Sequence, residues 1–81
     1  MPEEVPVLES AHRHGVSDAD IRHAYRNGIA AFRLDDSSEM VIGPDYSGRF
    51  LELGVGYSEY DGAEVIFHAM PARDEYLRRL L

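Results

Sequence analysis

Four polar residues could act together on a phosphate group if the fold brings them to one face of a sheet. If the last two predicted strands pair around the turn Asp61-Gly62, then Glu52 and His68 point to the same side. A carboxylate beside an imidazole can orient the ring for proton transfer near neutral pH. Arg33 on the first predicted strand and Arg73 just after the last one could clamp a phosphate. The alternative interpretation is a solvated sheet face with a routine Glu–His contact.

Two further residues lie at predicted strand ends, where they could contact an RNA chain. Arg49 begins the longest strand and could bind a phosphate or pair with Asp45. Tyr57 could stack on a base, with half-buried packing as the alternative. Metal-free RNA cleavage requires a base for the 2′-hydroxyl, an acid for the leaving oxygen and cations on the phosphorane, and these residue types are present. The expected catalytic residues are His68, Glu52, Arg49 and Arg73, and the expected substrate-binding residues are Arg33 and Tyr57.

The sequence lacks the motifs of other site chemistries. It has no cysteine, which excludes disulfides, thiolate zinc sites, iron–sulfur clusters and cysteine nucleophiles. It has neither a His-Glu-x-x-His pattern nor a Gly-x-Ser-x-Gly elbow. Gly54-Val55-Gly56 lies inside a predicted strand without the rest of a dinucleotide fingerprint, so it indicates a bulge or a close backbone approach. Neither a metal nor a cofactor is therefore expected.

The length of 81 residues fits one small domain. Fifteen acidic residues against eight basic ones give a net charge of −7, which argues against a protein that coats nucleic acid with its whole surface but leaves room for a local basic site. All the basic residues are arginine. Two explanations are selection of arginine for bidentate contacts with phosphate and a GC-rich coding sequence. The longest apolar run, Ile29–Phe32, is too short to cross a membrane, and no signal peptide is evident, so a cytoplasmic location is expected.

Hydrophobic spacing predicts an α+β domain, with two N-terminal helices packed on a four-stranded antiparallel meander sheet and a short C-terminal helix. The first helix is expected over residues 7–13. The second begins after the N-cap Ser17 and ends at Asn27-Gly28. Strands are expected over residues 30–35, 39–43, 49–58 and 63–69, and the terminal helix over residues 72–81.

The two N-terminal helices are expected to cover one face of the sheet and to leave the other face open for a site. The covered face would carry Phe32, Leu34, Met40, Ile42, Leu51, Leu53, Val55, Val65 and Phe67. The open face would carry Arg33, Phe50, Glu52, Ile66 and His68. Phe50 and Ile66, exposed together there, would invite a second subunit, so a homodimer is one expected assembly.

Three segments resemble the BrnT toxin family, in the right order and approximate spacing over residues 12 to about 76. Residues 12–17 (HRHGVS) resemble its K-H-G-V-S segment, and residues 41–51 (VIGPDYSGRFL) resemble its I-G-x-S-x-x-G-R-x-L strand–turn–strand. Residues 64–73 (EVIFHAMPAR) resemble its last strand and the Ala-Arg segment that follows. Matching positions are His14, Gly15, Gly48 and Arg49. Where the family usually has an arginine after the last-strand alanine, this chain has Met70, with Arg73 the nearest arginine.

The resemblance implies a fold like that of the RelE superfamily, ribonuclease activity that inhibits translation, and a ribbon–helix–helix antitoxin as partner. The leading hypothesis is a toxin component that cleaves RNA without a metal and is held inactive by its antitoxin. The alternative is a non-catalytic protein-binding module of the same fold, whose acidic surface engages a basic partner. A single patch joining Arg33, Arg49, His68 and Arg73 would favour the enzyme, and scatter of these groups would favour the module.

Overall fold

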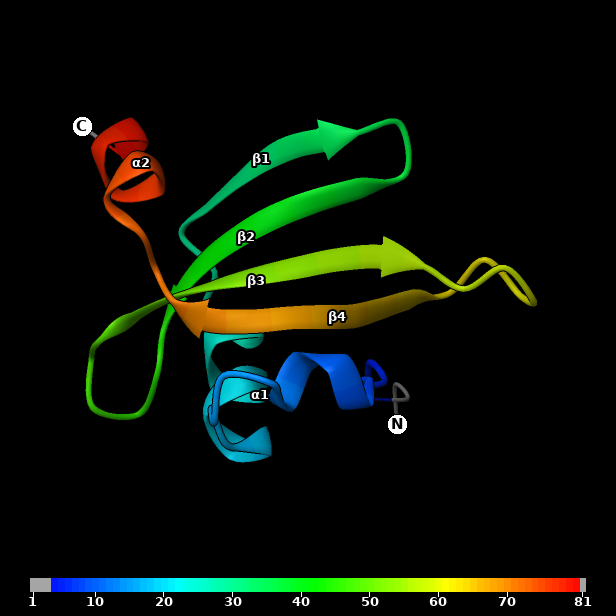
Figure 1. Cartoon of the computed structure of the whole chain (residues 1–81), viewed down its shortest axis with the longest axis horizontal. Coiled ribbons are helices and arrows are strands. Elements are labelled where there is room, and N and C mark those ends of the chain that lie inside the picture. Colours follow the sequence, from blue (N-terminus) through cyan, green and yellow to red (C-terminus); the bar gives the residue numbers. More distant parts are fainter. Residues whose placement is uncertain (1–3, 81) are drawn as a thin grey trace.

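A four-stranded antiparallel sheet forms the centre of the protein, with the strands in sequence order (Figure 1). The computed structural model describes residues 4–80. The strands are β1 (Ala30–Asp35), β2 (Ser38–Pro44), β3 (Phe50–Tyr57) and β4 (Glu64–Pro71). The helical segments, with η marking 3-10 helix, are η1 (Glu9–His12), α1 (Asp18–Arg26), α2 (Asp74–Leu77) and η2 (Arg78–Leu80). The predicted α+β class and four-stranded antiparallel sheet are confirmed.

Helix α1 begins and ends at the capping residues that the sequence indicates. The hydroxyl of its N-cap, Ser17, accepts a hydrogen bond from the backbone N–H of Asp20 at 3.1 Å. At the other end, the backbone N–H of Asn27 donates to the carbonyl of His23 at 3.1 Å. The apolar side of this helix faces the sheet.

An extended segment and one 3-10 turn take the place of the first predicted helix. Val7 forms a parallel bridge to Ile66 of β4, and the N–H of Leu8 donates to the carbonyl of Ile66 at 2.9 Å. Pro6 favours this arrangement because it lacks an N–H and disfavours helical geometry in the residue before it. The prediction of two N-terminal helices is therefore wrong, since residues 4–29 contain one α-helix.

The helix after the sheet is also shorter than predicted. Residues 74–77 form the single α-helical turn α2, and η2 continues it as a 3-10 turn. The last residue of the predicted helix, Leu81, lies outside the described residues. Among residues 4–80, no helix is long and apolar enough to cross a membrane.

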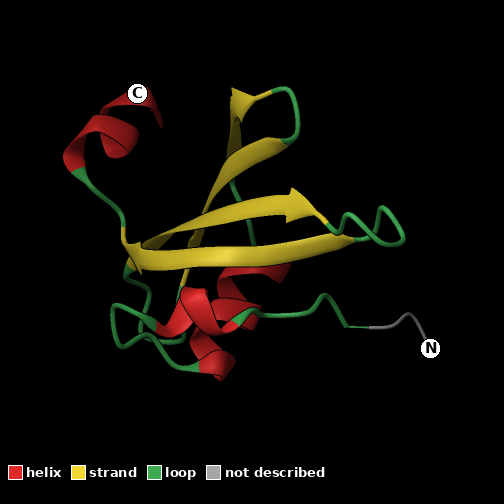
Figure 2. Cartoon of the chain, turned by 45° about the vertical axis from the view of Figure 1, so that its right-hand side comes forward, coloured by secondary structure: helices red, strands yellow, loops and turns green. Residues whose placement is uncertain are grey.

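The main core lies between the sheet and the segments η1 and α1, on a side that we call the α1 face (Figures 1 and 2). Leu51, Leu53 and Val55 project into this core, as predicted. A Cβ atom at Gly43 would collide with the backbone carbonyl of Ala24, so α1 lies directly on the backbone of β2. The other buried members of the core are Ala11, Val16, Ile21, Ala24, Ile66 and Ala69.

Several apolar side chains predicted under α1 lie instead on the opposite side of the sheet, which we call the second face. Phe32 pairs with Met40, and Ile42 pairs with Glu52, across neighbouring strands. Directly paired residues share a face, and Glu52 lies opposite to Leu53 because successive strand residues alternate. The predicted face of Phe32, Met40 and Ile42 is therefore wrong.

The C-terminal segment lies on the side of the sheet away from α1 and covers an apolar part of the second face (Figure 2). The rings of Phe32 and Tyr76 have centroids 6.3 Å apart, and the guanidinium of Arg79 lies 4.1 Å from the Phe32 ring centroid. Beyond this contact Leu34 is 42% exposed, although it was expected to be covered. Arg33 alternates with Phe32 and so lies on the α1 face, which corrects its predicted position on the open face.

A β-bulge in β4 shifts the alternation of that strand. His68 pairs with Gly54, and Ile66 pairs with Val55, so Phe67 is the extra residue between two consecutive pairs. Ile66 points into the core on the α1 face and is fully buried. The side chain of Phe67 lies against Gly54, beside His68, on the second face.

Because of this bulge, the predicted faces of three side chains in β4 are wrong, whereas the predicted shared face of Glu52 and His68 is confirmed. Val65 and Phe67 lie on the second face rather than under α1, and Ile66 lies in the core rather than on the open face. The exposed pair of Phe50 and Ile66, from which a homodimer was predicted, does not form. Glu52 and His68 do share the second face, as predicted.

Candidate active site

A buried carboxylate, that of Glu52 on β3, holds the polar side chains of the second face together. It is 0% exposed. Its Oε1 accepts hydrogen bonds from the backbone N–H of Arg73 at 2.9 Å and from Nε of Arg73 at 3.0 Å. Its Oε2 accepts from Nη2 of Arg73 at 2.7 Å and lies 3.0 Å from Nε2 of His68. One carboxylate thus fixes the positions of a guanidinium and an imidazole.

These contacts decide the ionisation of Glu52 and the tautomer of His68. Burial alone would raise the pKa of Glu52, but the hydrogen bonds from Arg73 and His68 outweigh burial, so this pKa lies below its usual value. An ionised carboxylate can only accept hydrogen bonds. His68 therefore donates from Nε2, which leaves Nδ1 of the neutral ring with the free lone pair.

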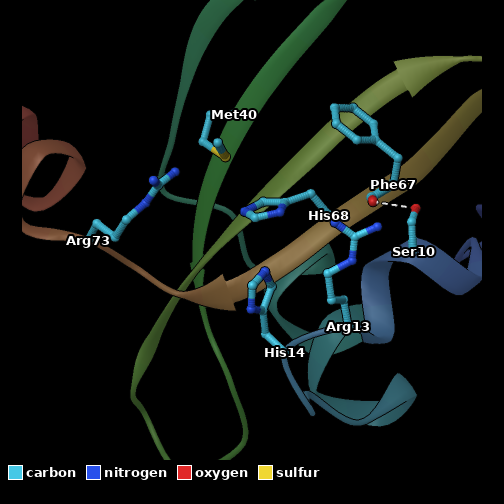
Figure 3. Close-up of a pocket in the computed structure, with 7 residues that line it drawn as sticks. All are labelled: Ser10, Arg13, His14, Met40, Phe67, His68 and Arg73. Atoms are coloured by element: carbon cyan, nitrogen blue, oxygen red, sulfur yellow. Dashed lines mark hydrogen bonds between the residues drawn. The ribbon is translucent and has the colours of Figure 1, made fainter.

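His68 and Arg73 line a pocket of about 410 Å³ on the second face (Figure 3). The ring of His14 meets the ring of His68 edge-on, with centroids 5.6 Å apart. Arg13 and Arg73 lie on opposite sides of the His68 ring in Figure 3. The complete lining is Ser10, Arg13, His14, Met40, Phe67, His68 and Arg73. Two guanidinium groups and two imidazoles, with no carboxylate in the lining, suit an anionic ligand.

The two pocket arginines differ in how much of their charge is already matched. Arg73 is bound to Glu52, and its Nη1 lies 3.7 Å from the carboxylate of Glu75. The guanidinium of Arg13 forms no ion pair or hydrogen bond with the other residues of the range 4–80. Arg13 is therefore the cation with the most unmatched charge in the pocket.

Three predicted site residues belong neither to the pocket lining nor to the cluster around Glu52. Arg49 sits in the loop after β2, where its backbone N–H donates to Asp45 at 2.9 Å and its Nε lies 3.3 Å from the same carboxylate. Arg33 pairs with Glu39 on the α1 face. Tyr57 ends β3 and is 54% exposed. Of the six predicted residues, the structure brings together Glu52, His68 and Arg73.

Arg13 and His14 are pocket residues that the candidate set omitted. They follow η1, and their approach to β4 depends on the bridge of Val7 to that strand. The sequence did contain a signal for these two residues, namely a cluster of cationic and imidazole side chains in which two histidines flank Arg13 just before Gly15. Gly15 has φ +78°, a left-handed conformation that turns the chain at this point.

The fold and the pocket together define a small α+β domain with a cationic hollow beside a buried Glu–His–Arg cluster. Comparisons with family models, with curated proteins and with solved structures return no match for this chain. In the range 4–80, no group of three or more His, Asp or Glu side chains is placed to hold a metal ion. The functional assignment therefore depends on the chemistry of the pocket.

Proposed function

We propose that the protein is the toxin component of a type II toxin–antitoxin system, a metal-independent endoribonuclease that inhibits translation in the cytoplasm. The observation that carries this proposal is the buried carboxylate of Glu52 orienting His68 at the wall of a cationic pocket. The BrnT-like motifs support the same assignment, since two of them, residues 12–17 and residues 64–73, supply pocket residues.

The proposed reaction is an internal transesterification of RNA. Nδ1 of His68 takes the proton of a 2′-hydroxyl, whose oxygen then attacks the adjacent phosphorus. The bond from phosphorus to the 5′-oxygen breaks, and the imidazolium of His14 gives that oxygen a proton. The products are a 2′,3′-cyclic phosphate and a free 5′-hydroxyl. Glu52 stabilises the protonated form of His68 during this step.

Cations beside the two imidazoles stabilise the negative charge of the phosphorane. Arg13 is placed best for this role because its guanidinium is unmatched by a carboxylate in the described structure. Arg73 contributes through Nη1, while its Nε and Nη2 hold Glu52 in place. Arg49 has no role in the proposed reaction, since its side chain contacts the carboxylate of Asp45 outside the pocket.

The proposed partner is a cognate antitoxin of the ribbon–helix–helix type. The net charge of −7 favours association with a basic protein segment, at a rate that falls as salt concentration rises. The basic segment would bind the acidic exterior, outside the pocket. Inhibition would follow where the antitoxin chain also crosses the pocket and so excludes RNA.

One observation favours the alternative, a non-catalytic protein-binding module. Arg33 and Arg49 are scattered away from His68, and Arg73 is matched by Glu52, so fewer cations converge than the sequence predicted. Expression of the chain without an antitoxin separates the two functions. We expect growth arrest from the wild type and relief by His68→Ala, with Arg33→Ala as a matched control that still arrests growth. No arrest by a folded wild-type chain would favour the module.

A further inference from the structure

Phe67 is the one aromatic residue in the lining of the pocket apart from its histidines, and it directly precedes His68. The bulge in β4 makes this placement, because the extra residue lets two consecutive side chains project from the same face. Ser10, another residue of the pocket lining, holds the backbone at this point. The hydroxyl of Ser10 donates to the Phe67 carbonyl at 2.6 Å.

The ring of Phe67 packs against the backbone of β3. A Cβ atom added at Gly54 would be 2.8 Å from Cζ of the ring, and one added at Gly56 would be 3.5 Å from Cε2. The ring therefore spans both glycines, against bare backbone. The side chain remains partly exposed where it lines the pocket.

A partly exposed aromatic ring packed on a sheet, next to cations, is the arrangement on which proteins stack the bases of single-stranded nucleic acid. In this pocket the cations are Arg13 and Arg73, and the group that would act on the sugar is the neighbouring His68. A base stacked on Phe67 would belong to a nucleotide flanking the phosphate bound by these cations. A base within a duplex is already stacked on both sides and could not reach the ring.

We infer that Phe67 is a stacking platform for a nucleobase beside the scissile phosphate, so that the substrate is single-stranded RNA with at least one unstacked base. This inference rests on the proposed ribonuclease function and adds a substrate class to it. Gly54 takes part indirectly, because a Cβ atom there would lie 2.8 Å from the ring, so only glycine at this position leaves the ring where it is.

The test compares two uncleavable ligands of equal charge. One is a 2′-deoxy trinucleotide of adenine, and the other is a trimer of abasic deoxyribose phosphates carrying the same fluorophore. Their affinities for the full chain are measured by fluorescence anisotropy for the wild type, Phe67→Leu and Phe67→Tyr. Phe50→Leu serves as the matched control, because Phe50 is an exposed aromatic outside the pocket. Circular dichroism verifies that each variant is folded.

We expect the wild type to prefer the adenine trimer by roughly 5- to 100-fold, as stacking of one base predicts. Phe67→Leu should abolish this preference, whereas Phe67→Tyr and Phe50→Leu should retain it. Equal affinity of the wild type for both ligands, binding of neither, or a preference that survives Phe67→Leu would each overturn the platform.

Cleavage of an RNA trinucleotide, measured in parallel, separates this inference from the proposed function. Cleavage without any preference for bases would reject the platform and leave the nuclease standing. A base preference lost in Phe67→Leu, without cleavage by the wild type, would support the platform and reject the nuclease.

Discussion

Nε2 of His68 on β4 lies 3.0 Å from Oε2 of the buried Glu52 on β3, although the two residues are not direct partners in the sheet. Glu52 pairs with Met70, and His68 pairs with Gly54, so the contact runs diagonally between strands. Diagonal neighbours are about 7–8 Å apart at Cα, which only long side chains bridge. Because Gly54 has no side chain, the ring of Phe67 and the Cβ atom of His68 lie close above its backbone.

The first prediction concerns the space above Gly54. A methyl group there would lie 2.8–2.9 Å from the Phe67 ring and the His68 Cβ, so Gly54→Ala should displace both side chains. We expect the free energy of unfolding to fall by ~1–3 kcal/mol, as overpacking does. Gly56→Ala is the matched control, because its methyl group would meet Phe67 at an ordinary 3.5 Å. Urea denaturation that shows equal stability for the two variants would contradict this account of the site.

The second prediction concerns the pairing of Arg73 with Glu52. Arg73→Ala would leave a buried carboxylate with His68 as its remaining side-chain partner, which should cost ~2–4 kcal/mol of stability, less than for a fully buried pair because Arg73 is half exposed. Arg73→Lys should recover only part of this loss, since lysine cannot donate through a fork. The double variant Arg73→Ala/Glu52→Gln should be more stable than Arg73→Ala. Chemical denaturation that finds the double variant no more stable would show that the buried charge is not the cause.

The third prediction is a loss of stability in acid. The folded state lowers the pKa of Glu52, so the unfolded chain takes up the proton first as the pH falls. The stabilisation is complete above about pH 4.3, the usual glutamate value, and is lost as the pH falls through the lower pKa of the folded state. Denaturation curves from pH 7 down to pH 2.5 should therefore have a shallower pH dependence for Glu52→Gln than for the wild type. Identical slopes would argue against an ionised Glu52.

The fourth prediction is a late-titrating tyrosine. Burial, together with the hydrogen bond that its hydroxyl donates to Glu64, raises the pKa of Tyr25 to about 12. Because this pKa is raised, the stabilisation is full below about pH 10 and is lost as the pH rises toward 12. Absorbance at the tyrosinate band should show one of the five tyrosines ionising after the others, and Tyr25→Phe should remove that step. A wild-type titration without a late step would refute the contact with Glu64.

The sequence predicted the elements of the sheet well because each strand is bounded by strong turn residues. The N-cap at Ser17 and the shared side of Glu52 and His68 also followed from local pattern and from the Asp61-Gly62 turn. Gly54-Val55-Gly56 was rightly interpreted as a bulge or close approach, since the register shifts there and Phe67 lies on it.

The remaining errors come from interactions that act between distant segments. Alternation defines two faces of a strand but not which face a helix covers. Phe32 and Ile42 were therefore assigned to the wrong side of a sheet that has apolar side chains on both faces. The bulge at Phe67 adds one residue and inverts the strand beyond it. Arg13 reaches the pocket only because the segment before η1 pairs with β4, a contact without a local sequence signal.

The central claim is that His68, held by Glu52, transfers the proton in RNA cleavage. The most direct measurement is the rate at which the purified chain, in the presence of EDTA, converts a single-stranded oligoribonucleotide to a product ending in a 2′,3′-cyclic phosphate. We expect cleavage by the wild type, a loss of about 10²–10⁴-fold in His68→Ala, and an unchanged rate in Arg33→Ala, whose side chain lies on the opposite face. Equal rates for the wild type and His68→Ala, or no cleavage by a folded wild-type chain, would contradict the claim.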